Sequence, residues 1–328
     1  MKHSVSQVTK NVRRSLVAIL FSVFMVPIAF SQFDAQVSHY MFHMPTFNPA
    51  SIGENGMINV TGQYRMQWMG MPGAPQTLHF TINAPLKSSE KVTNGLGLKF
   101  QRDALGAFVN QTGHLQYAFK RTIGKSTLSL GADLGFVSVG FVYDSIRAEV
   151  NSEYHDFLGD AAIPTIDDTG SNLDLSLGAF YSAPKYYLGI SYVHLNAPRI
   201  KLNDDRTQFN VNGALYATGG YDLAFRDPKW VLRSSALFKS DFTSWQAEVS
   251  SRMEYDQKFW GGLSYRYQDA VVVFLGANLT NGLMIGFSYD APASRMIKAS
   301  WGSPEVLISY SFVFDFGNNS RYKSIRIL

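Results

Sequence analysis

The stretch from Phe259 to Asp290 constrains the fold most strongly, because apolar and polar side chains alternate through three consecutive runs. The runs are separated by tight turns at Gln268-Asp269 and Asn281-Gly282. Side chains on a strand alternate between its two faces, so each run predicts a strand with one apolar, aromatic face. The opposite face carries Gly, Ser and polar residues instead of the Lys and Glu of a soluble sheet. This pattern is typical of a barrel with lipid outside and a polar lumen.

The same alternation recurs along the chain and predicts about fourteen antiparallel strands, an even number as in single-chain outer-membrane barrels. Besides the three strands within 259–290, the predicted strands span 57–69, 77–84, 95–102, 111–121, 126–141, 172–182, 186–194, 210–224, 230–239, 242–255 and 305–316. Because sequence patterns define strand ends only to within a few residues, twelve or sixteen strands stay open as alternatives. The fold class is therefore an all-β transmembrane barrel.

The lengths of the connections support this strand count. Short turns at 122–125, 183–185, 225–229 and 278–282 fall on one side, whereas long connections at 142–171, 195–209 and 291–304 fall on the other. Outer-membrane barrels have short periplasmic turns and longer extracellular loops. The exceptions are a longer inward connection at 86–94 and short outward turns at 240–241 and 268–269. Both ends of the barrel are therefore expected on the periplasmic side.

Composition narrows the class of protein further. Only 16% of the residues are charged, against about a quarter in average soluble domains. The net charge of +4 is modest and the basic residues are scattered, so no nucleic-acid partner is expected. The chain has no cysteine, which excludes disulfides and thiolate metal sites.

The first residues have the pattern of a signal peptide. Basic residues within 2–14 precede an apolar run at 15–30, and Ala29 and Ser31 are small residues at the positions that a signal peptidase recognises. We expect residues 1–31 to be removed by cleavage between Ser31 and Gln32. The alternative is a membrane anchor, but this run contains Pro27 and is shorter than the roughly 20 residues of a spanning helix. The mature protein is then expected in the outer membrane of a Gram-negative bacterium.

Three regions are expected in the mature chain. The N-terminal segment, residues 32–55, precedes any clear alternation and contains the turn-initiating pair Asn48-Pro49. We expect it on the periplasmic side or inside the lumen as a plug. Residues 56–316 form the barrel, and 317–328 form a basic tail that is either a floppy end or a periplasmic docking peptide.

Four short motifs appear in order near the start of the mature chain. They are Ser38-His39-Tyr40-Met41-Phe42, then Asn48-Pro49-Ala50 with Gly53, then Tyr64-Arg65-Met66-Gln67-Trp68, then Gly73-Ala74-Pro75-Gln76-Thr77. Together they resemble the PorP/SprF family, whose usual pattern is S-x-Y-M-F, N-P-A-x-x-G, Y-R-x-Q-W and G-x-P-x-T. The resemblance covers essentially the whole mature chain. His43 and Ser51-Ile52 depart from the usual residues, which weakens inferences about contacts there.

The resemblance implies an outer-membrane component of the type IX secretion system of Bacteroidetes, tied in some members to gliding motility. It implies as partners a periplasmic peptidoglycan-binding lipoprotein, secreted adhesin-type substrates and other secretion-system subunits, besides outer-membrane lipid. The main alternative is a fatty-acid-transporter-like barrel for hydrophobic small molecules, although such barrels carry a longer plug than 32–55. A third class is a barrel enzyme.

Seven residues are candidates for anchoring a partner or the N-terminal segment. On the first predicted strand Arg65 and Gln67 face the lumen, whereas Tyr64 and Trp68 share the face of Met66. The alternative is ordinary barrel filling plus an aromatic girdle at the membrane interface. The complete candidate set is Tyr40, Asn48, Pro49, Tyr64, Arg65, Gln67 and Trp68.

No residues of the chain predict catalysis, a cofactor or a metal site. An acidic cluster in the longest loop has oxygen ligands that permit a divalent ion, but its spacing matches no EF-hand or zinc motif, so a solvated loop is favoured. The cluster comprises Glu153, His155, Asp156, Asp160, Asp167 and Asp168. No G-x-S-x-G, H-E-x-x-H or Gly-rich phosphate loop occurs. We therefore expect a protein that is not an enzyme.

Overall fold

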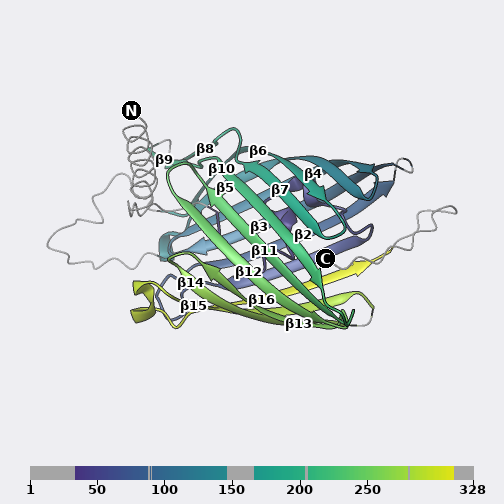
Figure 1. Ribbon diagram of the computed structural model, residues 1–328. Coiled ribbons are helices and arrows are strands. Elements are labelled where there is room, and N and C mark those ends of the chain that lie inside the picture. Colours follow the sequence, from purple (N-terminus) through teal and green to yellow (C-terminus); the bar gives the residue numbers. More distant parts are fainter. Residues whose placement is uncertain are drawn as a thin grey trace, which may run out of the picture. The chain divides into compact units, whose positions relative to one another are not determined.

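The computed structural model describes residues 34–87, 89, 91–145, 166–203, 206–279 and 281–313. Their main feature is a closed antiparallel barrel of fourteen strands (Figure 1). It closes where β1 (Ile58–Met66) pairs with β16 (Ser303–Phe312), with Gly62 opposite Ile308. The predicted fold class and strand number are confirmed. Among the described residues no helix is long and apolar enough to span a membrane.

Each remaining barrel strand pairs with the next one along the chain. In order they are β2 (Gln76–Lys87), β3 (Val92–Leu105), β4 (Phe108–Ile123), β5 (Ser126–Phe141), β6 (Asp168–Ser182), β7 (Tyr186–Val193), β10 (Ala214–Ala224), β11 (Trp230–Ser240), β12 (Trp245–Tyr255), β13 (Phe259–Arg266), β14 (Ala270–Asn278) and β15 (Leu283–Pro292). In the described ranges, four short 3₁₀ turns lie between or before strands: η1 (Met44–Thr46), η2 (Pro49–Ser51), η3 (Tyr143–Ser145) and η4 (Arg295–Lys298).

A separate hairpin interrupts one connection that the sequence predicts to be a plain loop. β7 pairs directly with β10, and the chain between them forms β8 (Arg199–Leu202) and β9 (Thr207–Asn210). The hairpin forms because Ile200 and Leu202 are buried in an apolar cluster with Val137 and Val139 of β5. The predicted strand at 210–224 correspondingly begins only at Ala214.

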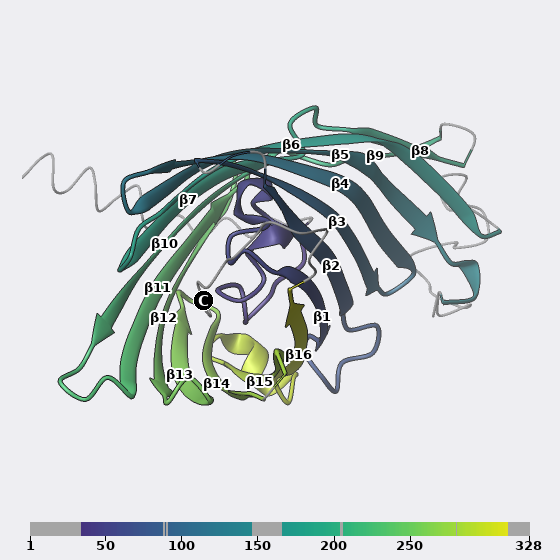
Figure 2. The same cartoon turned by 90° about the vertical axis from the view of Figure 1, so that its right-hand side faces the viewer.

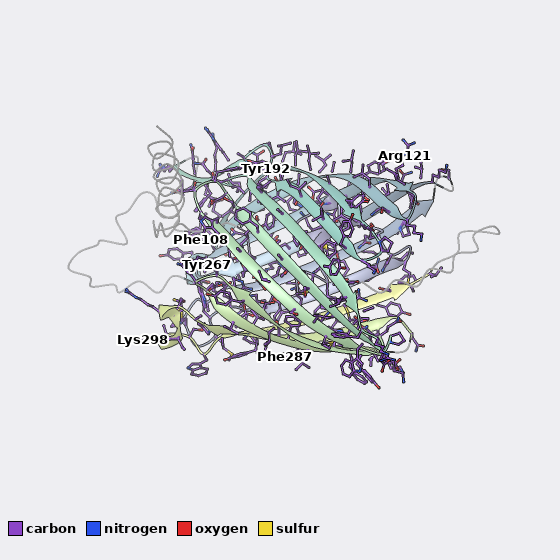
Figure 3. All side chains as sticks on the ribbon, viewed as in Figure 1. Phe108, Arg121, Tyr192, Tyr267, Phe287 and Lys298 are labelled. Carbon is purple, nitrogen blue, oxygen red and sulfur yellow. The ribbon has the colours of Figure 1, made fainter. Side chains whose placement is uncertain are left out.

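The long connections all lie at one end of the barrel, as expected, whereas short turns occur at both ends, with 106–107, 241–244 and 267–269 on the side of the long connections. β1 begins and β16 ends at one end, which we call the terminal rim, and the connections there include 124–125, 183–185 and 256–258. The other end, the distal rim, carries 67–75, 142–167, 194–213 and 293–302. In Figure 3, Arg121 and Lys298 lie at these two opposite ends.

The two faces of the wall differ as a membrane barrel requires. On β4, Leu115 and Tyr117 are exposed on the outside, whereas His114, Gln116 and Lys120 are buried on the inside. Apolar side chains facing lipid and polar side chains facing the lumen are the pattern of a transmembrane barrel. The inner face carries more charged residues than the alternating pattern of residues 259–290 suggests. Its buried charged residues include Arg65, Lys99, Asp133, Glu248, Arg252, Arg266, Asp290 and Glu305.

The first strand is shorter than predicted. It ends at Met66, so Gln67 and Trp68 belong to the connection to β2 and not to the strand. The reason is local: Trp68 has φ 52° in the left-handed region, which ends an extended strand. Gln67 N–H donates to the carbonyl of Pro75 at 2.9 Å and closes the connection. Of the last predicted strand, 305–316, residues beyond Val313 lie outside the described part of the chain.

Candidate functional site: the filled lumen

The described part of the N-terminal segment, residues 34–55, lies inside the ring of strands, shown in purple in Figure 2. Its burial is extensive: Ser38, Tyr40, Ala50 and Ile52 are all fully enclosed. Such a segment has no sheet partner of its own. Its backbone and side-chain polar groups must therefore be satisfied by its own short turns or by the barrel wall.

Asn48 fixes the turn at the centre of the segment. Its side-chain oxygen accepts from the Ala50 N–H at 3.0 Å and caps the short turn η2. Its side-chain nitrogen donates to the carbonyls of Ala179 on β6 and Ile190 on β7, at 3.2 and 3.4 Å. One side chain thus both shapes the turn and ties it to two strands. An Asn suits this position because it offers a donor and an acceptor together.

Glycines on the inner face make room for this turn. A Cβ on Gly131 of β5 would overlap the backbone of Ala50, and one on Gly178 of β6 would overlap the Asn48 side chain. A Cβ on Gly189 of β7 would lie 3.0 Å from the Asn48 nitrogen. The wall is therefore shaped for a close approach of the segment backbone, a common reason for glycine in a strand.

A buried ion-pair network lies next to the start of the segment. Arg65 of β1 contacts Asp290 at 2.8 Å and Glu305 at 3.4 Å. Arg266 of β13 contacts the same Asp290 at 2.8 Å and Glu248 at 2.8 Å. All five side chains are buried, so each charge depends on the others for compensation.

The segment itself completes this network. The N–H groups of Ser38 and His39 donate to the two carboxylate oxygens of Glu305 at 2.8 and 2.9 Å. The Ser38 hydroxyl donates to Asp290 at 2.7 Å and accepts from Arg65 at 2.9 Å. The His39 ring lies 2.6 Å from Glu305. The strands β1, β15 and β16, at the place where the barrel closes, therefore hold the segment through charge-assisted hydrogen bonds, which are stronger than neutral ones.

A second cluster of charged side chains holds Asp34, the first residue that the structure describes. The ring of His194, in the connection after β7, lies between Asp34 at 3.0 Å and Asp174 of β6 at 2.7 Å. Burial alone would lower the pKa of His194, but these carboxylates outweigh it and raise the pKa to about 10. Burial would likewise raise the pKa of Asp34, yet His194 and the Tyr216 hydroxyl hold it well below its usual range. At neutral pH the contact is therefore a charged pair.

The middle of the segment is held by neutral and cationic contacts. His43 meets Gln63 and Thr81 at 2.8 Å each, and burial lowers its pKa to about 4, so the ring is neutral at neutral pH. Lys99 of β3 donates to the Thr46 carbonyl at 3.2 Å. Lys120 of β4 donates to the carbonyl of Ala50 at 3.3 Å and pairs with Glu54 at 2.8 Å.

The seven candidate anchors fall in three places. In the lumen, Tyr40 contacts Ser235 and Ser250 through its hydroxyl at 3.0 Å each, and Asn48, Pro49 and Arg65 are buried. Tyr64 lies on the outer face and donates to Gln76 at 3.1 Å. Gln67 and Trp68 lie at the distal rim, where the Trp68 N–H donates to the Ser303 hydroxyl at 3.0 Å.

Several lumenal partners were not among the sequence candidates. Glu305, Asp290, Arg266, Asp174 and His194 all contact the segment or its immediate partners. The sequence indicated these residues only by placing charged side chains at inward-facing positions of strands whose outer face is apolar. Their pairing was not predictable, because Ser38 and Glu305 are 267 positions apart in sequence.

The acidic loop gives no metal centre in the described part of the chain. There, no three His, Cys, Asp or Glu residues are placed to hold a metal ion. Asp167 accepts from the Tyr143 N–H at 2.8 Å, and Asp168 accepts from the Thr169 N–H at 2.8 Å. The other members, Glu153, His155, Asp156 and Asp160, lie outside the described residues.

Fold and lumen together define an outer-membrane-type β-barrel whose interior is occupied by its own N-terminal segment. The chain matches the family model of the type IX secretion system membrane protein PorP/SprF over residues 29–310. It therefore belongs to the PorP/SprF family, and the resemblance noted in the motifs is confirmed. A comparison with curated proteins gives no match.

Solved structures with a similar chain path are outer-membrane barrels. The Ralstonia pickettii toluene transporter TbuX is 12% identical with a TM-score of 0.47, covering 82% of this chain and 92% of its own. A deletion mutant of the monoaromatic hydrocarbon channel TodX is 10% identical with a TM-score of 0.46, covering 81% and 93%. A mutant Rhodopseudomonas blastica porin is 10% identical with a TM-score of 0.35, covering 78% and 99%.

Proposed function

We propose that this protein is a non-enzymatic outer-membrane component of the type IX secretion system that serves export and surface attachment of specific adhesin-type proteins. The observation that carries the proposal is the lumen, which is occupied by a segment that is hydrogen-bonded to a buried ion-pair network of the wall. A barrel filled in this way is suited to be a rigid mount. Its rims are then the surfaces available to partners. Membership of the secretion-system family supports this role.

The topology suggests which partners each rim meets. The terminal rim has short turns and both barrel ends, the pattern of a periplasmic side. There we place a peptidoglycan-binding lipoprotein and other secretion-system subunits. The longer connections of the distal rim then meet the secreted substrate outside the cell. A role in gliding motility would follow if that substrate is a motility adhesin.

The remaining parts of the chain have matching proposed roles. Residues 1–31 act as a signal peptide cleaved before Gln32, and 32–55 act as a plug. Within the plug, Tyr40, Asn48 and Pro49 are anchors to the wall, and Arg65 anchors it from β1. The tail at 317–328 is a periplasmic end. Outer-membrane lipid surrounds the apolar wall, and no cofactor or metal takes part.

A deletion strain tests this function. Its cell-surface and secreted proteomes are compared with those of the parent and of a complemented strain. Loss of one or a few large secreted proteins, restored by complementation, is the expected result and identifies the client. An unchanged secretome together with slower uptake of a hydrophobic compound would contradict the proposal and favour the transporter alternative.

A further inference from the structure

A cavity of about 420 Å³ lies between the N-terminal segment and the barrel wall near the terminal rim. The segment contributes Met41, Phe42 and Met44, and β15 contributes Leu283 and Met284. Its volume lies within the roughly 300–1,000 Å³ of ligand pockets. Methionine-rich walls adapt to apolar ligands of varied shape, because the side chain is unbranched and flexible.

Most polar residues of the cavity wall already have partners; the exception is the buried side-chain oxygen of Asn278, at the end of β14. Thr61 and Ser309 bond each other at 2.7 Å. His43 is bonded through both ring nitrogens, and Glu54 is paired with Lys120. These groups need nothing from a ligand. Away from Asn278 at the rim, the cavity therefore favours an apolar occupant, since an incoming polar group would lose its hydration without compensation.

The apolar lining continues outward to the surface. Leu279 and Val313 line the cavity and are 46% and 71% exposed, at the terminal rim where β14 and β16 end. The ends of barrel strands lie at the level of the lipid headgroups. An apolar path thus leads from the membrane interface into the cavity. On its inner side the path meets the N-terminal segment, whose Met41, Phe42 and Met44 line the cavity.

We propose that this cavity binds the alkyl chain of a single-chain amphiphile, with the head group left at the terminal rim. A free fatty acid and a lysophospholipid share this chemistry. The site is independent of the proposed role in secretion, and either can fail without the other.

Binding of dansyl-labelled undecanoic acid to the purified full-length protein in amphipol tests the proposal. We expect saturable binding that Met284→Trp, which fills the cavity, weakens by about tenfold or more. Met296→Trp, the same change in η4 at the distal rim, should leave binding unaltered. Met57→Trp is a second cavity-filling variant, and heat-modifiable migration on gels shows which variants contain a folded barrel.

Competition identifies the source of the chain. Displacement by lauric acid alone indicates a free fatty acid, and displacement by lysophosphatidylethanolamine as well indicates a membrane lipid; both outcomes support the site. Equal binding by the parent, Met284→Trp and Met57→Trp would show partition onto the outer wall and overturn it. Absence of binding overturns it too, as does binding that requires removal of residues 317–328, because the tail would then be the natural occupant.

Discussion

Buried charges in this barrel depend closely on one another. Arg65 compensates two carboxylates, and one of these, Glu305, also accepts from the backbone of Ser38 and His39. Desolvating so many charges is costly, so such a network contributes little net stability compared with an apolar core. Removing one member is different, because it leaves an opposite charge buried without compensation.

Replacing Arg65 by Met should therefore destabilise the barrel by about 3–5 kcal/mol, the usual cost of breaking a buried ion pair from one side. Urea unfolding in detergent, followed by tryptophan fluorescence, measures the effect. Lys258→Met is the control, since its partner Asp256 and the lysine are both exposed at the terminal rim. Equal shifts of the unfolding midpoint in the two variants would contradict the assigned role of Arg65.

The His194 cluster predicts a pH dependence of stability. The pKa of His194 is raised from 6.5 to about 10, so between these values the native state holds a proton that the unfolded chain has lost. The stabilisation is complete below about pH 6.5, and it is lost as the pH rises toward 10. The titratable groups around the ring are Asp34 of the segment, Asp174 of β6, and more remotely His114 and Lys239.

Unfolding midpoints of the parent and His194→Gln, compared from pH 6 to pH 10, test this prediction. The parent should be the more stable at pH 6, and the difference should shrink steadily toward pH 10. A difference that stays constant over this range would show that the His194 charge does not hold Asp34.

At the scale of the elements, the turn at Asn48-Pro49-Ala50 fits closely against glycines of β5, β6 and β7. Gly131→Ala should destabilise the protein by about 1–3 kcal/mol through overpacking, because the new methyl group meets the Ala50 backbone. Gly62→Ala on β1 is a matched control, since nothing lies within 4 Å of its added Cβ. Urea unfolding compares them, and limited proteolysis reports whether residues 34–55 are released. Similar behaviour of both variants would contradict a close fit at Gly131.

Strand positions could be predicted from the sequence because each strand carries its own evidence. Apolar side chains on the outer face recur at every second position, as in β14 and β15, and turn residues separate the strands. The hairpin β8–β9 was not predictable in this way. Each of its strands has four residues, too few for a period to show, and its burial depends on β5.

The lumenal site was predictable only in part. Arg65 and Asn48 stand in motifs, so the sequence alone is enough to propose them as anchors. Their partners on β6, β15 and β16 come from distant parts of the chain, and alternation fixes a side chain's face but not its neighbour across a lumen. Trp68 was misplaced for a different reason: its left-handed backbone follows from the connection to β2 and not from its own preference.

At the scale of the whole molecule, the N-terminal segment joins the two halves of the wall. It contacts β1, β15 and β16 through Ser38 and His39, and β6 and β7 through Asn48. A barrel without such contacts has only strand pairing and packing against lipid to fix its cross-section. The segment therefore gives the rims a fixed geometry, which the proposed docking role requires.

The same contacts predict that the intact protein conducts no ions, although its wall has fourteen strands. In planar lipid bilayers the full mature chain should show no channel openings, whereas deletion of residues 34–55 should produce them. Because the deletion could also impair assembly, Ala50→Cys gives an independent measurement in a chain that has no natural cysteine. This side chain is fully buried and does not line the cavity, so it should resist a maleimide reagent until urea releases the segment. Channel openings by the intact chain, or rapid labelling of Ala50→Cys in the folded barrel, would show that the segment leaves the lumen spontaneously, and a closed mount would then be the wrong description.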